Sequence, residues 1–591
     1  MNSPGWADRR VNRRAVLGGF SALAAGALAT HVVAAPRTYG ASSAGLGFGS
    51  SGSAGGAGTP SWDSLGSIDV DSYPSFGRDE LGMLEYQFRK ATAAEGDWSL
   101  WEASVGFDGR PGVTGAEADG LQYDIHHSAS AVAIAVDKTP AYRDFAETVL
   151  GGVLAKGLDD RAWRYWTENA NHSHNDGSHV PYSADPAQSG NAMYMGNIMS
   201  VASKYALVTD SLSKSHQFEF VYRGDGVEIA GTKVTPGQSW RHSWDEIMQV
   251  FVRQIQADSG RMLLCQIPTR YLVCNVSVAQ SILGFDHVHG TSYAAQTVTG
   301  PDNMLEKIGA DWFVPARSSG QPLDMIYLVY KGVHTDGGLQ WFPGWAPAPF
   351  DQFSTWNLHQ ISHQFSTEAY EMTKRKFLSR LTDGTAYQCA PDGSEERNPF
   401  VAPVVGSGTT TSGQAIEFTM ADIVSTVHGA HAAAVLGDTE IAGQMLEWNR
   451  NYSGPLWDGH MLVHKFGDER PEYYLRNGYL QSMVLAAAAA RPGVLRESRV
   501  DRDRFVQPTL TGLAWPEVRV RAATFDAGRS ALIAQTTAKH DNRGTVTNLT
   551  PGSTVRLLID GRKASEAQAD NKGEFSFPVP AGDHSFIIGV A

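Results

Sequence analysis

Hydrophobic positions along most of the chain repeat with the period of a helix. One set of apolar residues spaced three and four positions apart consists of Phe145, Val149, Leu150, Val153 and Leu154. Such spacing places these side chains on one face of a helix, where they can pack against a core. Further helices are predicted for residues 416–436, ending at Gly437, and for residues 478–490, ending before Pro492. Asp438 or Thr439 is expected to cap the helix that follows Gly437.

Long polar loops rich in aromatic residues separate these helices. Several helical hairpins joined in this way are typical of a ring of paired helices. We therefore predict a mainly α protein in which residues 71–500 form an α/α barrel, a toroid of helical hairpins, with the loops building a site at one end. The same periodicity also permits an irregular helical bundle.

The last part of the chain has the period of β-strands. Residues 554–559 form an apolar, β-branched run before Asp560-Gly561, which is a hairpin turn signal. Residues 573–579 and 584–590 are further strand-like runs bounded by turn residues. We predict a small antiparallel β-sandwich domain over residues 511–591. A structural role is expected for it, with carbohydrate binding or oligomer contacts as alternatives.

The first seventy residues have the composition of a leader and a spacer. Arg13 and Arg14 precede an apolar, Gly/Ala-rich run that ends in small residues, so residues 1–35 are predicted to be a twin-arginine signal peptide. An uncleaved membrane anchor is the alternative, but glycine and polar residues interrupt the run. Residues 36–70 are predicted to be a flexible Gly/Ser-rich linker. We expect export to the periplasm, the cell envelope or the exterior, with no integral membrane span after processing.

Composition and charge exclude several classes of protein. The chain has 591 residues, of which 42% are hydrophobic, so it can bury a large core. With 48 Lys and Arg against 62 Asp and Glu, the net charge of −14 argues against a nucleic acid partner. Three cysteines cannot form the disulfide framework of a small secreted domain.

Two of these cysteines are candidates for proton transfer. Cys265 and Cys274 lie nine residues apart around Pro268, which would break any helix between them. One thiol could donate a proton while the other, as a thiolate, removes one, provided that their pKa values are separated by neighbours such as Arg270. A disulfide or two buried thiols are the alternatives. No C-x-x-C motif or helical His pair accompanies the cysteines, so we expect no metal site.

Histidines and carboxylates gather in two other segments. The first is a loop that contains Trp166, Glu168, His172, His174 and Asp176. This loop could hold an acid/base pair, a metal ion or only solvated side chains. The second segment is a helical run that begins at Tyr123, Asp124, Ile125, His126 and His127. Because adjacent residues point in different directions on a helix, one histidine can face a cavity while the other packs.

Four stretches of the chain resemble the bacterial linalool dehydratase/isomerase family. They are Trp166 through Asp185-Pro186, then Met193-Tyr194-x-Gly196, then Cys265-x8-Cys274-Asn275, and finally Phe285-Asp286-x-x-His289-Gly290-Thr291-x-Tyr293. Tyr123 matches a further point. The resemblance covers residues 115–300 and extends less closely to about residue 495.

The resemblance implies an α/α-barrel lyase without metal or organic cofactor. It implies a ring-shaped homo-oligomer, such as a pentamer, with sites near subunit boundaries. Cys265 and Cys274 would be the catalytic acid and base, Met193 and Trp166 would line an apolar pocket, and Tyr123 would contact the substrate hydroxyl or a neighbouring subunit's site.

The chain departs from the family pattern in two places. Asn197 stands where the family has a histidine, four residues after the pocket methionine, and an amide cannot titrate. His126, His127 or His174 are candidates to replace the missing imidazole. In the region 85–101, Asp97 is the candidate for the family's N-terminal catalytic carboxylate.

These observations predict an exported hydro-lyase or isomerase that acts on a small apolar alkenol or terpenoid alcohol. One alternative is a carbohydrate-active α/α-barrel enzyme, a glycoside hydrolase or polysaccharide lyase, that uses carboxylates such as Asp124, Glu168, Asp176 or Asp458. Another is a non-catalytic exported binding protein in which the C-terminal β domain binds the ligand.

Overall fold

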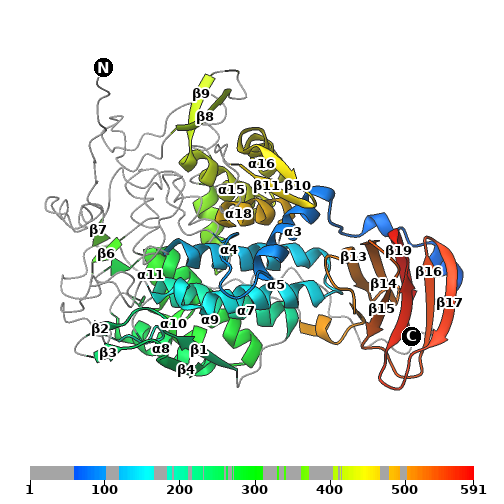
Figure 1. Ribbon diagram of the computed structural model, residues 1–591, viewed down its shortest axis with the longest axis horizontal. Coiled ribbons are helices and arrows are strands. Elements are labelled where there is room, and N and C mark those ends of the chain that lie inside the picture. The colour runs from blue at the N-terminus through cyan, green and yellow to red at the C-terminus, as the bar shows by residue number, and fades with distance from the viewer. Residues whose placement is uncertain are drawn as a thin grey trace, which may run out of the picture. The chain divides into compact units, whose positions relative to one another are not determined.

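The structure is a computed structural model, and the part of the chain after residue 56 forms one compact unit (Figure 1). It describes residues 59–101, 119–164, 183–188, 192–210, 216–229, 232–258, 261–263, 269–270, 272–310, 329–331, 339–340, 361–371, 374, 404–409, 413, 415–465, 478–492 and 502–591. The predicted signal peptide lies outside these residues. Within them, no helix combines the length and the apolar character needed to cross a membrane.

Five buried helices stand next to one another in the order α9, α7, α4, α18, α15. Their bounds are α4 Asp119–Ala135, α7 Ala192–Thr209, α9 Leu272–His289, α15 Met420–Leu436 and α18 Gly478–Ala489. All residues of α7 except Tyr205 are buried, and so are all those of α18 except Ala488. Helices that are buried on every side need neighbours on every side, so these five form an inner row.

Four further helices pack on the inner row. They are α3 Arg78–Ala91, α5 Asp144–Leu158, α8 Trp244–Ala257 and α16 Thr439–Ser453. Helix α5 lies beside α4 and α7, α8 beside α9, α3 beside α18, and α16 beside α15 (Figure 1). Helix α8 buries one face and exposes the other, as an amphipathic helix of an outer layer does, whereas α3 is buried over most of its length. The mainly helical character predicted from the sequence is confirmed for these residues.

Helices α7 and α9 approach each other closely at Gly196. A Cβ atom placed on Gly196 would lie 2.8 Å from Val278 Cγ2 and 3.0 Å from the Val278 nitrogen. The Ser281 hydroxyl donates a hydrogen bond of 2.9 Å to the Gly196 carbonyl oxygen. Only glycine fits here, and the close contact fixes the position of α7 relative to α9.

Helix boundaries agree in part with the sequence-based predictions. The face predicted for residues 145–154 is buried in α5. Helix α15 ends before Gly437, which has a φ of +91°, and the Asp438 carboxylate caps α16 by accepting a hydrogen bond of 3.4 Å from the Ile441 nitrogen. The predicted start at residue 416 is wrong, because Ala415–Thr419 forms strand β9, whose apolar and β-branched residues favour a hairpin with β8 Val404–Thr409.

Short elements connect the helices. The strands are β1 Gln217–Val221, β2 Val227–Ile229, β3 Thr232–Val234, β4 Ser239–Ser243, β5 Thr269–Arg270, β6 Val329–Lys331, β7 Leu339–Gln340, β10 Pro455–Asp458 and β11 Met461–His464. The short helices are α2 Trp62–Gly66, α10 Tyr293–Thr297, α11 Met304–Ile308 and the 3₁₀ turns η1 Val70–Ser72, η2 Val136–Lys138, η3 Asp160–Ala162 and η7 Arg502–Phe505.

The C-terminal residues form two antiparallel sheets, drawn from brown to red in Figure 1. One sheet has the order β13 Val518–Asp526, β14 Ala531–Ala538, β19 Gly582–Gly589, β16 Thr554–Ile559, β17 Arg562–Gln568. The other has the order β12 Thr509–Thr511, β15 Asn542–Thr547, β18 Phe575–Val579. The rings of Phe577 in β18 and Phe586 in β19 lie 5.4 Å apart, so side chains of the two sheets meet in one core.

The predicted linker differs from the structure from Ser61 onward. Helix α2 and the residues after it bury Leu65 and Ile68 against Ile533, Leu558 and Ile587 of the five-stranded sheet. These apolar side chains supply the burial that offsets the entropy of ordering, which the Gly/Ser-rich residues before them cannot do.

Side chains also join the sheets to the helices. The carboxylate of Glu85 in α3 accepts hydrogen bonds of 3.0 Å from Trp515 Nε1 and 3.1 Å from Arg519. The Leu510 nitrogen donates a hydrogen bond of 2.7 Å to the Ala141 carbonyl oxygen. Hydrogen bonds of side chains and of the backbone therefore join the β domain predicted for residues 511–591 to the helical region.

Candidate functional site

Helices α4 and α7 bring together two residues that the sequence analysis assigned to the site. The hydroxyl of Tyr123 in α4 donates a hydrogen bond to the sulfur of Met193 in α7. Met193 is buried and Tyr123 is half-buried. Their contact places a phenol and a thioether side by side on the inner row of helices.

His127 lies one turn after Tyr123 and is fully buried. Its Nδ1 atom is 2.7 Å from the Tyr123 carbonyl oxygen. Because a carbonyl oxygen can only accept, Nδ1 carries the proton and Nε2 carries the lone pair. Burial lowers the pKa of His127 to about 3, and the positive charges of Lys204 and Lys90 act in the same direction. The imidazole is therefore neutral at ordinary pH.

A tyrosine and a second histidine complete a cluster with His127. The Tyr479 ring in α18 lies 4.5 Å from the His127 ring, and its hydroxyl is hydrogen-bonded to Nε2 of His428 in α15. Burial lowers the pKa of His428 and raises that of Tyr479, so both side chains are neutral. The sequence analysis missed Tyr479 and His428, because only the packing of α4, α18 and α15 shows that they meet.

His126 points in another direction, as expected for adjacent residues of a helix. Its ring interacts with the backbone of Asn197 in α7, and burial lowers its pKa well below the usual range, with Lys204 adding to the effect. Of the three histidines considered as replacements for the family imidazole, His126 lies beside α7, whereas His127 contacts Tyr479 of α18 and His428 of α15. His174 lies outside the described residues, as does Trp166.

Asn197 begins a polar run on the face of α7 that carries Met193. Ser200 and Lys204 follow it at intervals of three and four residues, which keeps all of them on one face of the helix. The buried Lys204 ammonium donates hydrogen bonds to the Ser200 hydroxyl and, over 3.3 Å, to Gln280 Oε1 of α9. Ser200 also donates to Gln280 Oε1 over 2.8 Å. The sequence analysis missed Lys204 and Gln280.

A second buried lysine engages one of the candidate carboxylates. Lys90 in α3 forms an ion pair with Asp124, and both side chains are fully buried. The Lys90 ammonium also donates a hydrogen bond of 2.8 Å to the Ser128 hydroxyl and lies 4.2 Å from the centre of the Trp101 ring. Asp124 is therefore the counter-charge of a buried lysine, which opposes its use as a glycosidase acid or base.

One of the two candidate cysteines belongs to the described residues. Cys274 is buried in the first turn of α9, and a Cβ atom placed on Gly196 would lie 3.3 Å from its carbonyl oxygen. The neighbouring Asn275 accepts a hydrogen bond of 2.7 Å from the Leu263 nitrogen and donates one of 3.1 Å to the Leu263 carbonyl oxygen. The Asn275 side chain thus binds the backbone at Leu263, two residues before Cys265. Cys265 itself lies outside the described residues.

Asp97 has a different environment. Its carboxylate is exposed and accepts a hydrogen bond of 2.9 Å from the Ser99 nitrogen in the same turn, which lowers its pKa. Lys156 donates a hydrogen bond of 2.7 Å to the Asp97 carbonyl oxygen. The structure does not place this carboxylate with Tyr123 or Met193.

The D-x-x-H-G-T-x-Y motif has a structural role in the described residues. The Asp286 carboxylate accepts hydrogen bonds of 3.0 Å from the Tyr293 nitrogen and 2.7 Å from the Ala294 nitrogen, which cap helix α10. It also binds the Thr291 hydroxyl. Tyr293 in turn donates a hydrogen bond of 2.9 Å to Asp245 of α8. These contacts join α8, α9 and α10.

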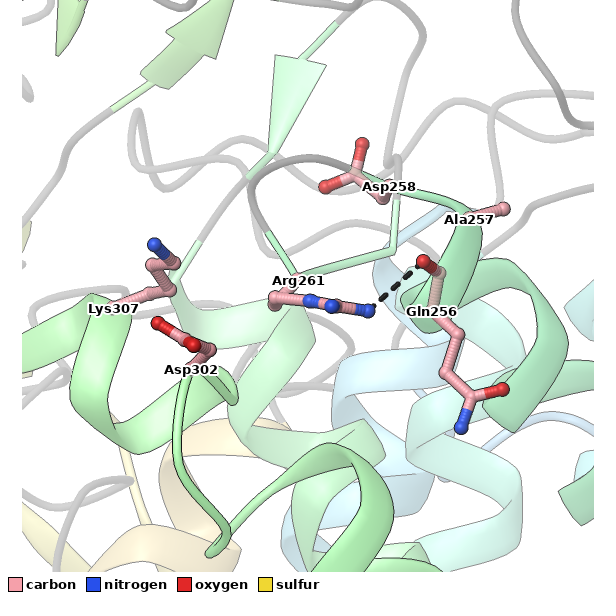
Figure 2. A pocket seen from close by; sticks show the side chains of 6 residues that line it. All are labelled: Gln256, Ala257, Asp258, Arg261, Asp302 and Lys307. Atoms are coloured by element: carbon pink, nitrogen blue, oxygen red, sulfur yellow. Dashed lines mark hydrogen bonds between the residues drawn. The ribbon is translucent and has the colours of Figure 1, made fainter.

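A pocket of about 310 Å³ opens near the end of α8. Its lining consists of Gln256, Ala257, Asp258, Arg261, Asp302 and Lys307 (Figure 2). Arg261 lies between Lys307 and Gln256, and its guanidinium donates a hydrogen bond of 2.9 Å to the Gln256 carbonyl oxygen. Such a charged lining does not fit an apolar alcohol. The part of the chain that the structure describes contains no group of three or more His, Cys, Asp and Glu side chains suited to a metal ion.

The described residues thus form a mainly helical protein that buries a thiol, a thioether and neutral imidazoles on adjacent helices. The family model described as linalool dehydratase/isomerase matches residues 122–469, which is more than half of the chain, and the chain belongs to this family. The resemblance stated from the sequence motifs is thereby confirmed. Membership indicates a lyase or isomerase of the linalool dehydratase type.

Among solved structures, the chain is similar to a GH127 β-L-arabinofuranosidase from Geobacillus stearothermophilus T6. The two share 10% sequence identity, and the match covers 89% of this chain and 79% of that chain with a TM-score of 0.21. A TM-score this low does not establish a common fold, so the match gives no information about substrate.

Proposed function

We propose that this chain is a cofactor-independent hydro-lyase and isomerase that dehydrates an apolar alkenol or terpenoid alcohol through acid/base chemistry of Cys265 and Cys274. The observation that carries the proposal is the pair of hydrogen bonds, 2.7 and 3.1 Å long, between the Asn275 side chain and the backbone of Leu263. Asn275 directly follows one cysteine, and Leu263 precedes the other by two residues. Two residues span at most about 7 Å of chain, so this link holds the two arms of the cysteine segment together.

The proposed reaction conserves atoms and electrons. One thiol donates a proton to the substrate hydroxyl, and the C–O bond breaks with release of water. The thiolate of the second cysteine then takes a proton from the adjacent carbon, and the electron pair of that C–H bond forms the new C=C bond. Addition of water at the other end of the allylic system gives the isomerised alcohol instead. No oxidant or reductant is consumed.

The wall formed by α4 and α7 suits this chemistry. The thioether of the buried Met193 offers a soft, polarizable surface to an apolar chain. The neutral His127 adds no positive charge beside Tyr123, which favours a substrate that develops allylic cation character.

The remaining features of the enzyme are part of the same proposal. The inner and outer rows of helices support an α/α barrel. A ring-shaped homo-oligomer and export by the twin-arginine route are proposed from the family resemblance and the leader sequence. The carbohydrate-active alternative is weakened, because Asp124 is paired with Lys90 and Asp458 is exposed on β10.

Product analysis with cysteine variants tests the proposal. The folded, reduced protein is incubated with linalool, geraniol and shorter alkenols, and dienes and isomers are measured by gas chromatography. Cys265→Ala and Cys274→Ala should each lower turnover by about 10²–10⁴, the usual contribution of a general acid or base. Cys389→Ala, which removes the third cysteine, is the matched control and should retain turnover. Equal turnover in all three variants, or no product from any alkenol, would contradict the proposal.

A further inference from the structure

Two buried amide groups on the inner row have donors that bind nothing among the described residues. Asn197 is 3% exposed and Gln280 is fully buried, yet neither Asn197 Nδ2 nor Gln280 Nε2 has a hydrogen-bond partner there. Buried donors in native proteins are almost always satisfied by protein, water or a ligand. These two nitrogens therefore require acceptors that the described side chains do not supply.

Lys204 fixes the orientation of the Gln280 amide. An ammonium group can only donate, and it lies 3.3 Å from Gln280 Oε1. The Ser200 hydroxyl donates to the same oxygen over 2.8 Å. The oxygen of Gln280 must face these two donors, so the Nε2 donor of Gln280 faces away from Lys204.

Ser200 connects the two residues that carry these donors. Asn197 and Ser200 are three residues apart on α7, which places them on neighbouring positions of one face, and Ser200 contacts Gln280. Met193 lies one turn before Asn197 on that face and binds the Tyr123 hydroxyl. Asn197 thus belongs to the same wall as the proposed apolar pocket, and Gln280 approaches this wall from α9.

We propose that Asn197 Nδ2 and Gln280 Nε2 together bind a second oxygen of the substrate, so that the substrate is an alkenol that also carries a carbonyl or a further hydroxyl group. The inference rests on the proposed function for the reaction itself. A hydroxyl oxygen has two lone pairs, and two amide donors would occupy both. The leaving hydroxyl must keep a lone pair for the proton that it receives, whereas a carbonyl oxygen can accept both donors without taking part in the reaction.

Binding of unreactive ligands tests the inference separately from turnover. The probes are 6-methyl-5-hepten-2-one and 2-methyl-2-heptene, which share a carbon skeleton and differ in the carbonyl group. Calorimetry on the wild-type protein should give an affinity at least about tenfold higher for the ketone, because the carbonyl oxygen satisfies two buried donors.

Two substitutions locate the donors. Gln280→Glu keeps an oxygen toward Lys204 and removes the amide donor, and Asn197→Leu removes the other donor at nearly equal volume. Each should lower the ketone-to-hydrocarbon affinity ratio about tenfold, with thermal unfolding measured to verify folding. Gln296→Glu, an exposed glutamine on α10, is the matched control and should keep the wild-type ratio.

The outcomes separate this inference from the proposed reaction. Equal wild-type affinities for the two probes, or an unchanged ratio in both donor variants, would overturn the inference and assign the donors to ordered water. Ketone selectivity in a protein that turns over no alkenol would support the donor site and contradict the thiol reaction. Turnover of alkenols without ketone selectivity would contradict the donor site alone.

Discussion

His127 shows, at the scale of a single residue, how its surroundings determine the state of an ionisable side chain. The hydrogen bond to the Tyr123 carbonyl oxygen determines its tautomer, and complete burial keeps it uncharged. His242 is the opposite case, because its hydrogen bond of 2.7 Å to the Asp185 carboxylate raises its pKa above the usual value. Two histidines of one protein are thus expected to take up their protons at different pH, with the pKa of His242 above 6.5 and that of His127 near 3.

We predict that His127 remains neutral between pH 5 and pH 8, because its pKa is lowered to about 3. NMR of protein labelled in the histidine rings measures this directly, with His127→Asn used to assign the signal. The His242 signal is the internal control and should titrate with a midpoint above 6.5. A midpoint above pH 5 for His127 would contradict the prediction.

Sequence motifs identified part of the site at this scale. Tyr123 and Met193 were selected from the chain, and the structure joins them. Lys204, Gln280 and Tyr479 were missed because each acquires its role from a partner on another helix. Spacing along one helix shows which residues share a face, but it does not show what that face contacts.

At the scale of the helices, local signals placed several boundaries correctly, and the start of α15 was the exception. Gly437 and Asp438 ended one helix and capped the next as expected. The beginning of α15 was misplaced because residues 415–419 combine apolar character with β-branched residues, which fit a strand or a helix until the partner strand β8 is known. The close contact at Gly196 has no signal in single-helix periodicity, because it depends on the position of α9.

We predict that Gly196→Ala destabilises the protein by about 1–3 kcal/mol, since the new methyl group would press on Val278 and separate α7 from α9. Turnover should fall with stability, because the same shift moves Met193 of α7 relative to Cys274 of α9. Urea unfolding and product formation measure the two effects. Gly443→Ala on α16 is the control: that position is exposed with nothing within 4 Å, so alanine should be neutral or stabilising by up to about 1 kcal/mol. Equal stability of the two variants would refute the explanation.

At the scale of the whole molecule, the interior holds several histidines in the neutral form. Burial is the main cause of the lowered pKa values of His126, His127, His428 and His464. In the unfolded chain these side chains take up protons near pH 6.5, whereas in the folded protein they do so only at lower pH. The stability that they contribute is present above pH 6.5 and is lost as the pH falls.

We predict that the free energy of unfolding decreases from pH 6.5 toward pH 4 by about 1.4 kcal/mol per pH unit for each such histidine. His464 provides the test, since burial lowers its pKa to about 4 and it lies on β11, away from the α4–α7 wall. Urea unfolding at pH 6.5 and pH 5 measures how the free energy of unfolding changes with pH. In His464→Asn this change should be smaller by the contribution of one histidine. An unchanged slope would show that His464 does not contribute.

The packing of α2 on the five-stranded sheet has a consequence for the order of events during synthesis. Leu65 lies against Gly589 and Ile587, which the ribosome adds more than five hundred residues later. The apolar side chains around α2 stay exposed to solvent until strand β19 has emerged and paired. A chain shortened by its last ten residues lacks β19, so Leu65 and Ile68 lose part of the surface on which they pack. Proteases should therefore cleave this chain within residues 61–70 before they cleave the buried helices.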